Sequence, residues 1–311
     1  MDIHETLGVL AHRGGLLVSR PELTVGVVSA VSRTTGLELD LLARRPLDRR
    51  DADQRRADIQ AGRSKPRTAP RRLLPAHDEG IELRVGWLTG DGRARWEYGS
   101  VASSSGDHFA GVLGPSLRTV LDLPPLFDEV SIVLAWPEIG FPETVVELPL
   151  PDRAAVERGT VSIWDAPVMA GEVAESLIDR TGTHLPEELA IETGRVVAGP
   201  RVLSRAADAV LVLDRLTAVG GELSMEILSV ARGDRARAIR SPAESAGIAV
   251  VEGNDAVWIP MYLGSAQGGG RTFRATAEFA LRGHGDGVLD LVVAWPAAGL
   301  RGRRVRMSWP G

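Results

Sequence analysis

One short stretch occurs twice in this chain, and it constrains the fold more than any other feature. Residues 133–140 read VLAWPEIG, and residues 292–299 read VVAWPAAG. Each stretch begins inside an apolar run that is rich in β-branched residues and short for a helix, so it predicts a central β-strand. Pro137 and Pro296 then end the strand, because proline has no N–H for the hydrogen-bond ladder.

A further strand follows each stretch at the same spacing. Apolar residues alternate there with polar or small ones, which is the pattern of a strand with one buried face. The two strands are related by an offset of 159 positions, and their apolar residues are Val146, Leu148 and Leu150 in the first copy and Val305, Met307 and Trp309 in the second. The matched spacing and phase indicate an internal duplication.

Earlier segments also match between the two copies. Residues 23–33 and 36–44 predict a hairpin, because two apolar runs flank a short turn. Residues 210–230 contain its counterpart, in which Glu226–Arg232 lines up with Glu38–Arg44. This match adds a second pair of strands to the duplicated unit.

The first copy contains one more hairpin, formed by residues 81–88 and 93–98 around a glycine turn. Its expected counterpart consists of residues 257–261, a loop over 264–270, and a returning strand over 273–281. The glycine- and serine-rich residues 99–116 are expected to form an irregular loop.

The predicted fold is therefore all-β, with two tandem β-sandwich domains of immunoglobulin-like size that arose by internal duplication. The first copy spans residues 1–155, and the second spans residues 194–311. Residues 156–193 form a short helix-bearing connector. A helical turn is expected over 152–158, across the boundary with the first copy, and an amphipathic helix over 171–180.

Composition limits the class of protein. The chain has 311 residues, of which 44% are hydrophobic and 25% charged, as in folded soluble proteins with two domains. It contains no cysteine, which excludes disulfides and thiolate chemistry. The N-terminus lacks the pattern of a signal peptide, and no apolar run is long enough to span a membrane. We therefore expect a cytoplasmic protein without a membrane partner.

Residues 48–75 interrupt the strand pattern. They contain nine arginines or lysines and four aspartates, a local charge of +5 (9 − 4). Residues 232–246 are the shorter, arginine-rich equivalent in the second copy. The candidate interaction residues are Arg49, Arg50, Arg55, Arg56, Arg63, Lys65, Arg67, Arg71, Arg72, Arg235, Arg237 and Arg240. One interpretation is a basic surface that binds nucleic acid or an acidic protein, and the other is a solvated loop. Binding of single-stranded nucleic acid would require aromatic residues among the arginines for base stacking, and residues 48–75 contain none.

The sequence shows no catalytic constellation. Its six histidines lie at no metal-ligand spacing, and it has no zinc-protease motif, nucleophile elbow, phosphate loop or dinucleotide fingerprint. Acid pairs such as Glu138 with Glu143, or Asp286 with Asp290, are compatible with glycosidase chemistry, but acids are too common to identify it. We expect a protein that is not an enzyme and that has no cofactor and no metal.

Trp136 and Trp295 allow two interpretations. An exposed indole next to a proline is a platform for a sugar or a peptide, whereas a buried one fills the end of a sandwich core. We favour the core, because a large aromatic side chain at the end of an apolar strand buries much surface.

The repeated stretch also resembles a group of uncharacterised actinobacterial proteins. In them a strand ends in Trp-Pro and is followed by Gly, an apolar residue, Pro, Glu and Thr, as in residues 136–144 here. A preceding proline-rich element corresponds to residues 123–126. The likeness covers residues 23–165, and the second copy lacks the Pro-Glu-Thr. The resemblance implies this fold and a bacterial origin, but no activity.

Three functional hypotheses follow. The first is a non-catalytic protein-interaction or assembly subunit, which contacts another protein through loops or strand edges. The second is a nucleic-acid-associated factor that uses the arginine-rich loops 48–75 and 232–246, for which binding would depend strongly on salt. The third is a sugar-binding or hydrolytic domain, which requires an accessible Trp136 or Trp295.

Overall fold

The computed structural model describes most of the chain, namely residues 5–45, 57–58, 60–63, 71–78, 83–98, 101–105, 116–173, 178–180, 194–219, 221–239, 241, 244, 246–261, 263–269, 271–282 and 287–309. The described residues form two compact units. The N-terminal sandwich contains those from Val9 to Gly159, and the C-terminal sandwich contains Glu5–Gly8 and those after Gly159. The described part of the predicted connector beyond Gly159 thus groups with the C-terminal sandwich.

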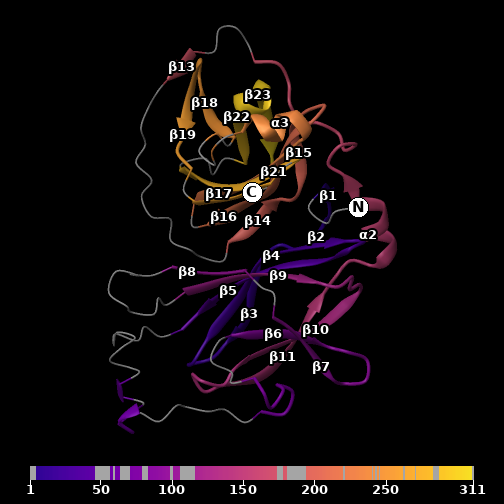
Figure 1. Ribbon diagram of the computed structural model, residues 1–311, viewed down its shortest axis with the longest axis vertical. Helices are drawn as coiled ribbons and strands as arrows, with labels where there is room; N and C mark the ends of the chain where they lie inside the picture. The colour runs from indigo at the N-terminus through magenta and orange to yellow at the C-terminus, as the bar shows by residue number, and fades with distance from the viewer. Residues whose placement is uncertain are drawn as a thin grey trace. The chain divides into compact units, whose positions relative to one another are not determined.

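The N-terminal sandwich consists of two antiparallel sheets (Figure 1). Its large sheet has the described strands β2 (Val9–His12), β3 (Gly15–Ser19), β4 (Thr24–Arg33), β5 (Gly36–Arg44), β9 (Ser116–Leu123) and β8 (Val101–Ser105). Its small sheet has the order β11 (Phe141–Pro149), β10 (Glu129–Trp136), β6 (Arg84–Leu88) and β7 (Ala94–Glu97). Helix α2 (Arg153–Gly159) follows, as the sequence predicts.

The C-terminal sandwich repeats this topology. Its large sheet has the described strands β14 (Arg195–Ala198), β15 (Arg201–Ala206), β16 (Ala209–Val219), β17 (Glu222–Arg232), β21 (Thr272–Arg282) and β20 (Leu263–Gly269). Its small sheet has the order β13 (Ile178–Arg180), β19 (Asp255–Ile259), β18 (Gly247–Glu252), β22 (Val288–Trp295) and β23 (Leu300–Ser308). Helix α3 (Gly233–Ala238) and the 3₁₀ helix η4 (Pro296–Ala298) complete it. The all-β fold with two duplicated sandwiches is confirmed.

Two parts of the predicted alignment are wrong. The bulges of the two large sheets place Asp40 opposite Ser29 and Glu226 opposite Arg215, so Asp40 and Glu226 are equivalent and the β5–β17 offset is 186 (226 − 40). The predicted alignment used an offset of 188, which is two residues too large. A shift by two residues leaves the same side chains facing the core, because side chains alternate between the two faces of a strand.

The second error concerns the hairpin of the first copy that contains β6 and β7. Its counterpart is the pair β18 and β19, because Ala249 faces Trp258 just as Gly86 faces Trp96. Residues 272–282 instead form β21, which pairs with β17 in the large sheet and corresponds to β9.

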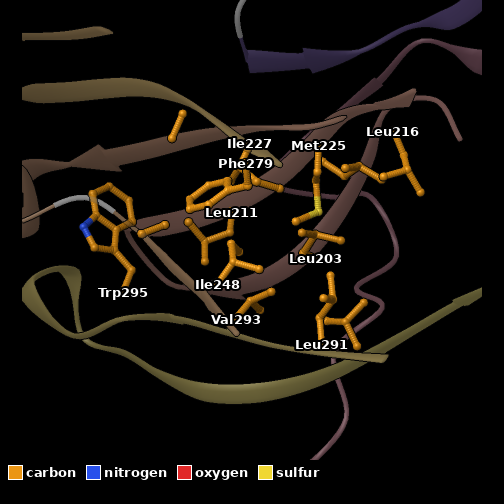
Figure 2. Close-up of a cluster of buried hydrophobic side chains, with 14 of the residues drawn as sticks. Leu203, Leu211, Leu216, Met225, Ile227, Ile248, Phe279, Leu291, Val293 and Trp295 are labelled. Carbon is orange, nitrogen blue, oxygen red and sulfur yellow. The ribbon is translucent and has the colours of Figure 1, made fainter. Parts of the chain in front are cut away.

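The core of each sandwich lies between its two sheets. Figure 2 shows this core in the C-terminal sandwich, where side chains of the large sheet, such as Met225 and Phe279, meet Ile248, Val293 and Trp295 of the small sheet. All five are at most 1% exposed. Close packing of this kind is what makes the alternating pattern of these strands readable from sequence.

The described part of the connector beyond Gly159 packs on the C-terminal sandwich. Strand β12 (Val161–Ser162) pairs with β1 (Thr6–Leu7), and Leu7 packs with Ile163 on residues of β15, β16 and β17. Strand β13 adds to β19 in parallel. Residues 178–180 are therefore extended and Gly171 forms a bridge with Arg304, so the helix predicted over 171–180 is wrong at both ends; its middle, residues 174–177, lies outside the described residues.

Glu5 holds the N-terminal segment in place on this sandwich. Its carboxylate accepts hydrogen bonds from Arg232 Nε at 3.0 Å and from Trp164 Nε1 at 3.3 Å. The Arg232 guanidinium also stacks 4.3 Å above the Trp164 ring. This arrangement links the first strand to the end of β17, far away in sequence.

Each large sheet contains an ion pair at its bulge. Asp40 on β5 accepts hydrogen bonds from Arg118 on β9, with Arg118 Nη2 2.8 Å from Asp40 Oδ2. Its equivalent, Glu226, pairs with Arg215 on β16. Burial raises the pKa of Asp40 to about 6 from an ordinary value near 3.8, although Arg118 acts in the opposite direction.

We expect Asp40 to make stability depend on pH between its unfolded and folded pKa values. A carboxyl with a raised folded pKa binds its proton more tightly in the folded chain, so stability falls as pH rises from about 4 to about 6. Hydrogen exchange of the β5 core amides, in the wild type and in Asp40→Asn at several pH values, gives the stability of the N-terminal sandwich as a curve against pH. The difference between the two curves should change across that window, and a constant difference would contradict the assignment.

Candidate interaction site

The end of the arginine-rich segment docks on the small sheet of the N-terminal sandwich. The carboxylate of Glu143, on β11, accepts backbone hydrogen bonds from Arg72 at 2.8 Å, Leu73 at 2.9 Å and Leu74 at 2.6 Å. The indole of Trp96, on β7, donates to the Leu73 carbonyl oxygen at 3.1 Å. Charge-assisted bonds to three consecutive N–H groups fix the path of the main chain here.

A second set of contacts holds the following residues. Asp78 is 5% exposed, and its Oδ2 lies 2.8 Å from Arg84 Nε on β6. The Arg84 guanidinium stacks 5.4 Å above the Tyr98 ring, and Arg71 donates to the Asp78 carbonyl oxygen. Burial, together with a hydrogen bond to Asp78, raises the pKa of the Tyr98 hydroxyl. Asp78 thus serves an ion pair, while its neighbour His77 is exposed.

The structure separates the other candidate arginines into different local roles. Arg63 pairs with Asp58 at 3.0 Å, and Arg237 on α3 pairs with Asp234. The guanidinium of Arg235 lies against Gly299 in the turn after η4. The remaining candidates lie outside the described residues: Arg49, Arg50, Arg55, Arg56, Lys65, Arg67 and Arg240.

Neither tryptophan of the repeated stretch is a sugar platform. Trp295 is 0% exposed and donates its indole N–H to the Glu244 carbonyl oxygen at 2.7 Å. Trp136 is 7% exposed, and Arg45 stacks 5.2 Å from its ring centroid. Both rings fill the core, so the sugar-binding hypothesis loses the two residues on which it depended.

The outer edge of β11 differs in its main-chain pairing from the equivalent edge of the C-terminal sandwich. In the C-terminal sandwich, the equivalent edge strand β23 already receives main chain: Gly171 N–H donates to Arg304 O at 2.7 Å, and Arg304 N–H donates to Gly171 O at 3.1 Å. Val133 pairs with Val145 as Val292 pairs with Arg304, so Val145 is the equivalent of Arg304. Among the described strands, only β10 pairs with β11.

Charge differs between these two edges. On β23, Arg306 and Arg304 both bind Asp290 of β22, at 3.0 Å and 2.8 Å, and hydrogen bonding from Arg304 is the main reason that the pKa of Asp290 is lowered. At the equivalent positions of the N-terminal sandwich, Glu147 accepts hydrogen bonds at 2.9 Å and 2.8 Å from the hydroxyl of Ser131. An acid therefore replaces the arginine on the edge strand.

Sequence reasoning named Glu143 as half of an acid pair and as part of the Pro-Glu-Thr motif, without a role, and it missed the β11 edge. The difference in charge could be read from the sequence, because the offset of 159 makes Val145 equivalent to Arg304 and Glu147 equivalent to Arg306. What sequence does not reveal is that Gly171 occupies the edge of one copy. That requires knowing the path of the connector.

No known protein family matches the chain, and no curated protein matches it. Among solved structures, one that is similar is described as "The crystal structure of the conserved domain protein from Bacillus anthracis". It shares 9% sequence identity over 94% of this chain and 79% of that chain, with a TM-score of 0.22. In the described part of the chain, no helix is long and apolar enough to cross a membrane.

Proposed function

We propose that this chain is a non-catalytic interaction subunit that adds an extended segment of another protein to the edge of β11. The observation that supports the proposal is the main-chain pairing of Gly171 with Arg304 at the equivalent edge of the other sandwich. Strand addition uses main-chain hydrogen bonds for affinity and alternate side chains for specificity. Duplicated folds present the same edge twice, and this chain fills one of them by itself.

The side chains of β11 support such a role. Val145 is 42% exposed at the centre of the strand. Pro142 and Pro149 lie near its ends, and proline there limits pairing because it donates no hydrogen bond. The accessible edge is therefore short, which favours a defined segment of a partner over open-ended aggregation. We place this binding in the bacterial cytoplasm.

Replacing Val145 by proline is expected to abolish capture of the partner. The equivalence with Arg304 places the N–H of Val145 on the side of β11 away from β10, so proline removes a donor for which the described strands provide no partner. Full-length wild type and Val145→Pro are used as bait in a bacterial lysate, at low and at high salt. A protein retained stoichiometrically by the wild type at both salts should be lost from the variant.

Val145→Thr is the matched control, because it keeps the N–H and the β-branched shape; it should capture as the wild type does. Equal capture by all three baits would refute strand addition at β11. Retention of nucleic acid alone, and only at low salt, would instead favour the arginine-rich segments as the binding surface.

A further inference from the structure

The two equivalent edge hairpins carry opposite charge. Residues 128–152, which contain β10 and β11, have six acidic residues and no arginine or lysine, a net charge of −6 (0 − 6). The equivalent residues 287–311 have four arginines and one aspartate, a net charge of +3 (4 − 1). Because the two hairpins share a fold but differ in the sign of their charge, we expect their edges to contact segments of different charge.

Two of the acids of β10 and β11 lie together at one corner of the outer face. Glu129 and Glu147 project from neighbouring strands on the face opposite the core, and both are exposed. They are diagonal neighbours, since Glu147 faces Ser131 and Glu129 faces Pro149. Among the described residues, the Ser131 hydroxyl donates a hydrogen bond to Glu147. In the other sandwich, Asp290 instead forms ion pairs with Arg304 and Arg306.

We infer that the segment bound at β11 is basic, with an apolar side chain beside Val145 and lysine or arginine at the alternate positions beside Glu147 and beside Pro149, which faces Glu129 across the β10–β11 pair. This inference rests on the proposed strand addition. Side chains of an added strand that project from one face recur at every second residue, so they follow Val145, Glu147 and Pro149 in step. Complementary charge then selects the partner and its register.

Three nine-residue peptides test this chemistry on the full chain by fluorescence anisotropy at low salt. The first has a central valine, with lysines two and four residues away on each side and threonines between, so it reads the same in either direction. The second has the same composition, but its lysines and threonines have exchanged positions, so the lysines project from the face opposite to that of the valine. The third has glutamates in place of the lysines of the first. The first should bind about ten-fold more tightly than either of the others.

Neutralising the corner separates the inference from the proposed function. In a Glu129→Gln and Glu147→Gln double variant, the first peptide should no longer bind ten-fold more tightly than the third, which has glutamates in place of its lysines. Equal binding of all three peptides to the wild type, lost in Val145→Pro, would keep strand addition and overturn the basic ligand. Binding that Val145→Pro leaves unchanged would overturn strand addition itself, and with it the inference.

Discussion

Replacing Trp295 by alanine is expected to lower the unfolding free energy of the C-terminal sandwich by about 3 to 5 kcal/mol, as for other fully buried aromatic residues. The side chain is 0% exposed, and its ring centroid lies 5.9 Å from that of Phe273. The substitution leaves a cavity at the end of the core. It also removes the donor that satisfies the Glu244 carbonyl oxygen at 2.7 Å.

Hydrogen exchange is the appropriate measurement, because a chain with two units does not unfold in a single two-state step. Core amides of β17 and β22 should lose protection in Trp295→Ala, while those of β5 and β10 in the other sandwich serve as the internal reference. Val288→Ala is the control on the same strand, since Val288 is 50% exposed and its truncation should change little. Unchanged protection of β22 would contradict the assigned role of Trp295.

The duplication was predictable because its signal is local. A strand with one face in a core must alternate, and the pairs β10–β11 and β22–β23 do so at a constant offset. The phase of the alternation also assigned β5 and β17 to equivalent strands, even though the predicted offset was two residues too large. Local patterns specify which face is buried, and they leave the absolute register to the turns and bulges.

Strands whose signal is not local were missed. Strand β18 reads GIAVVE, and four consecutive residues of it, Ile248–Val251, are mostly shielded on both faces, so no alternation marks it as the partner of β19. Strands β8 and β20 are rich in glycine and serine, and the sequence predicts loops there. They are edge strands that main-chain pairing to β9 and β21 holds in place. Composition says little about such pairing.

The candidate site was predictable only in outline. Charge density marked residues 48–75, but no local pattern shows that Arg72 and Leu73 dock through the carboxylate of Glu143, 70 residues away from Leu73. The motif in which Glu143 lies was recognised as a resemblance without a role. The structure assigns it one: the strand after the Trp-Pro turn carries the acid that anchors a distant segment.

Replacing Glu143 by alanine is therefore expected to release residues 71–78 from the small sheet. Three charge-assisted hydrogen bonds disappear together, and at this half-buried position we expect the local opening free energy to fall by about 2 kcal/mol. Backbone amides of Arg72, Leu73 and Leu74 should then exchange about thirty-fold faster, as measured by hydrogen exchange with residue resolution. Glu143→Gln, which keeps an acceptor oxygen without the charge, should give an intermediate rate.

Glu147→Ala is the matched control, because Glu147 lies on the same strand and bonds to the Ser131 hydroxyl instead of to the docked segment. It should leave the exchange of residues 72–74 unchanged while removing the acid proposed to meet a basic ligand. Opposite outcomes for these two neighbouring acids would show that β11 has two separable roles, one toward its own chain and one toward a partner. Unchanged exchange in Glu143→Ala would mean that Trp96 and the buried Leu74 hold the segment without it.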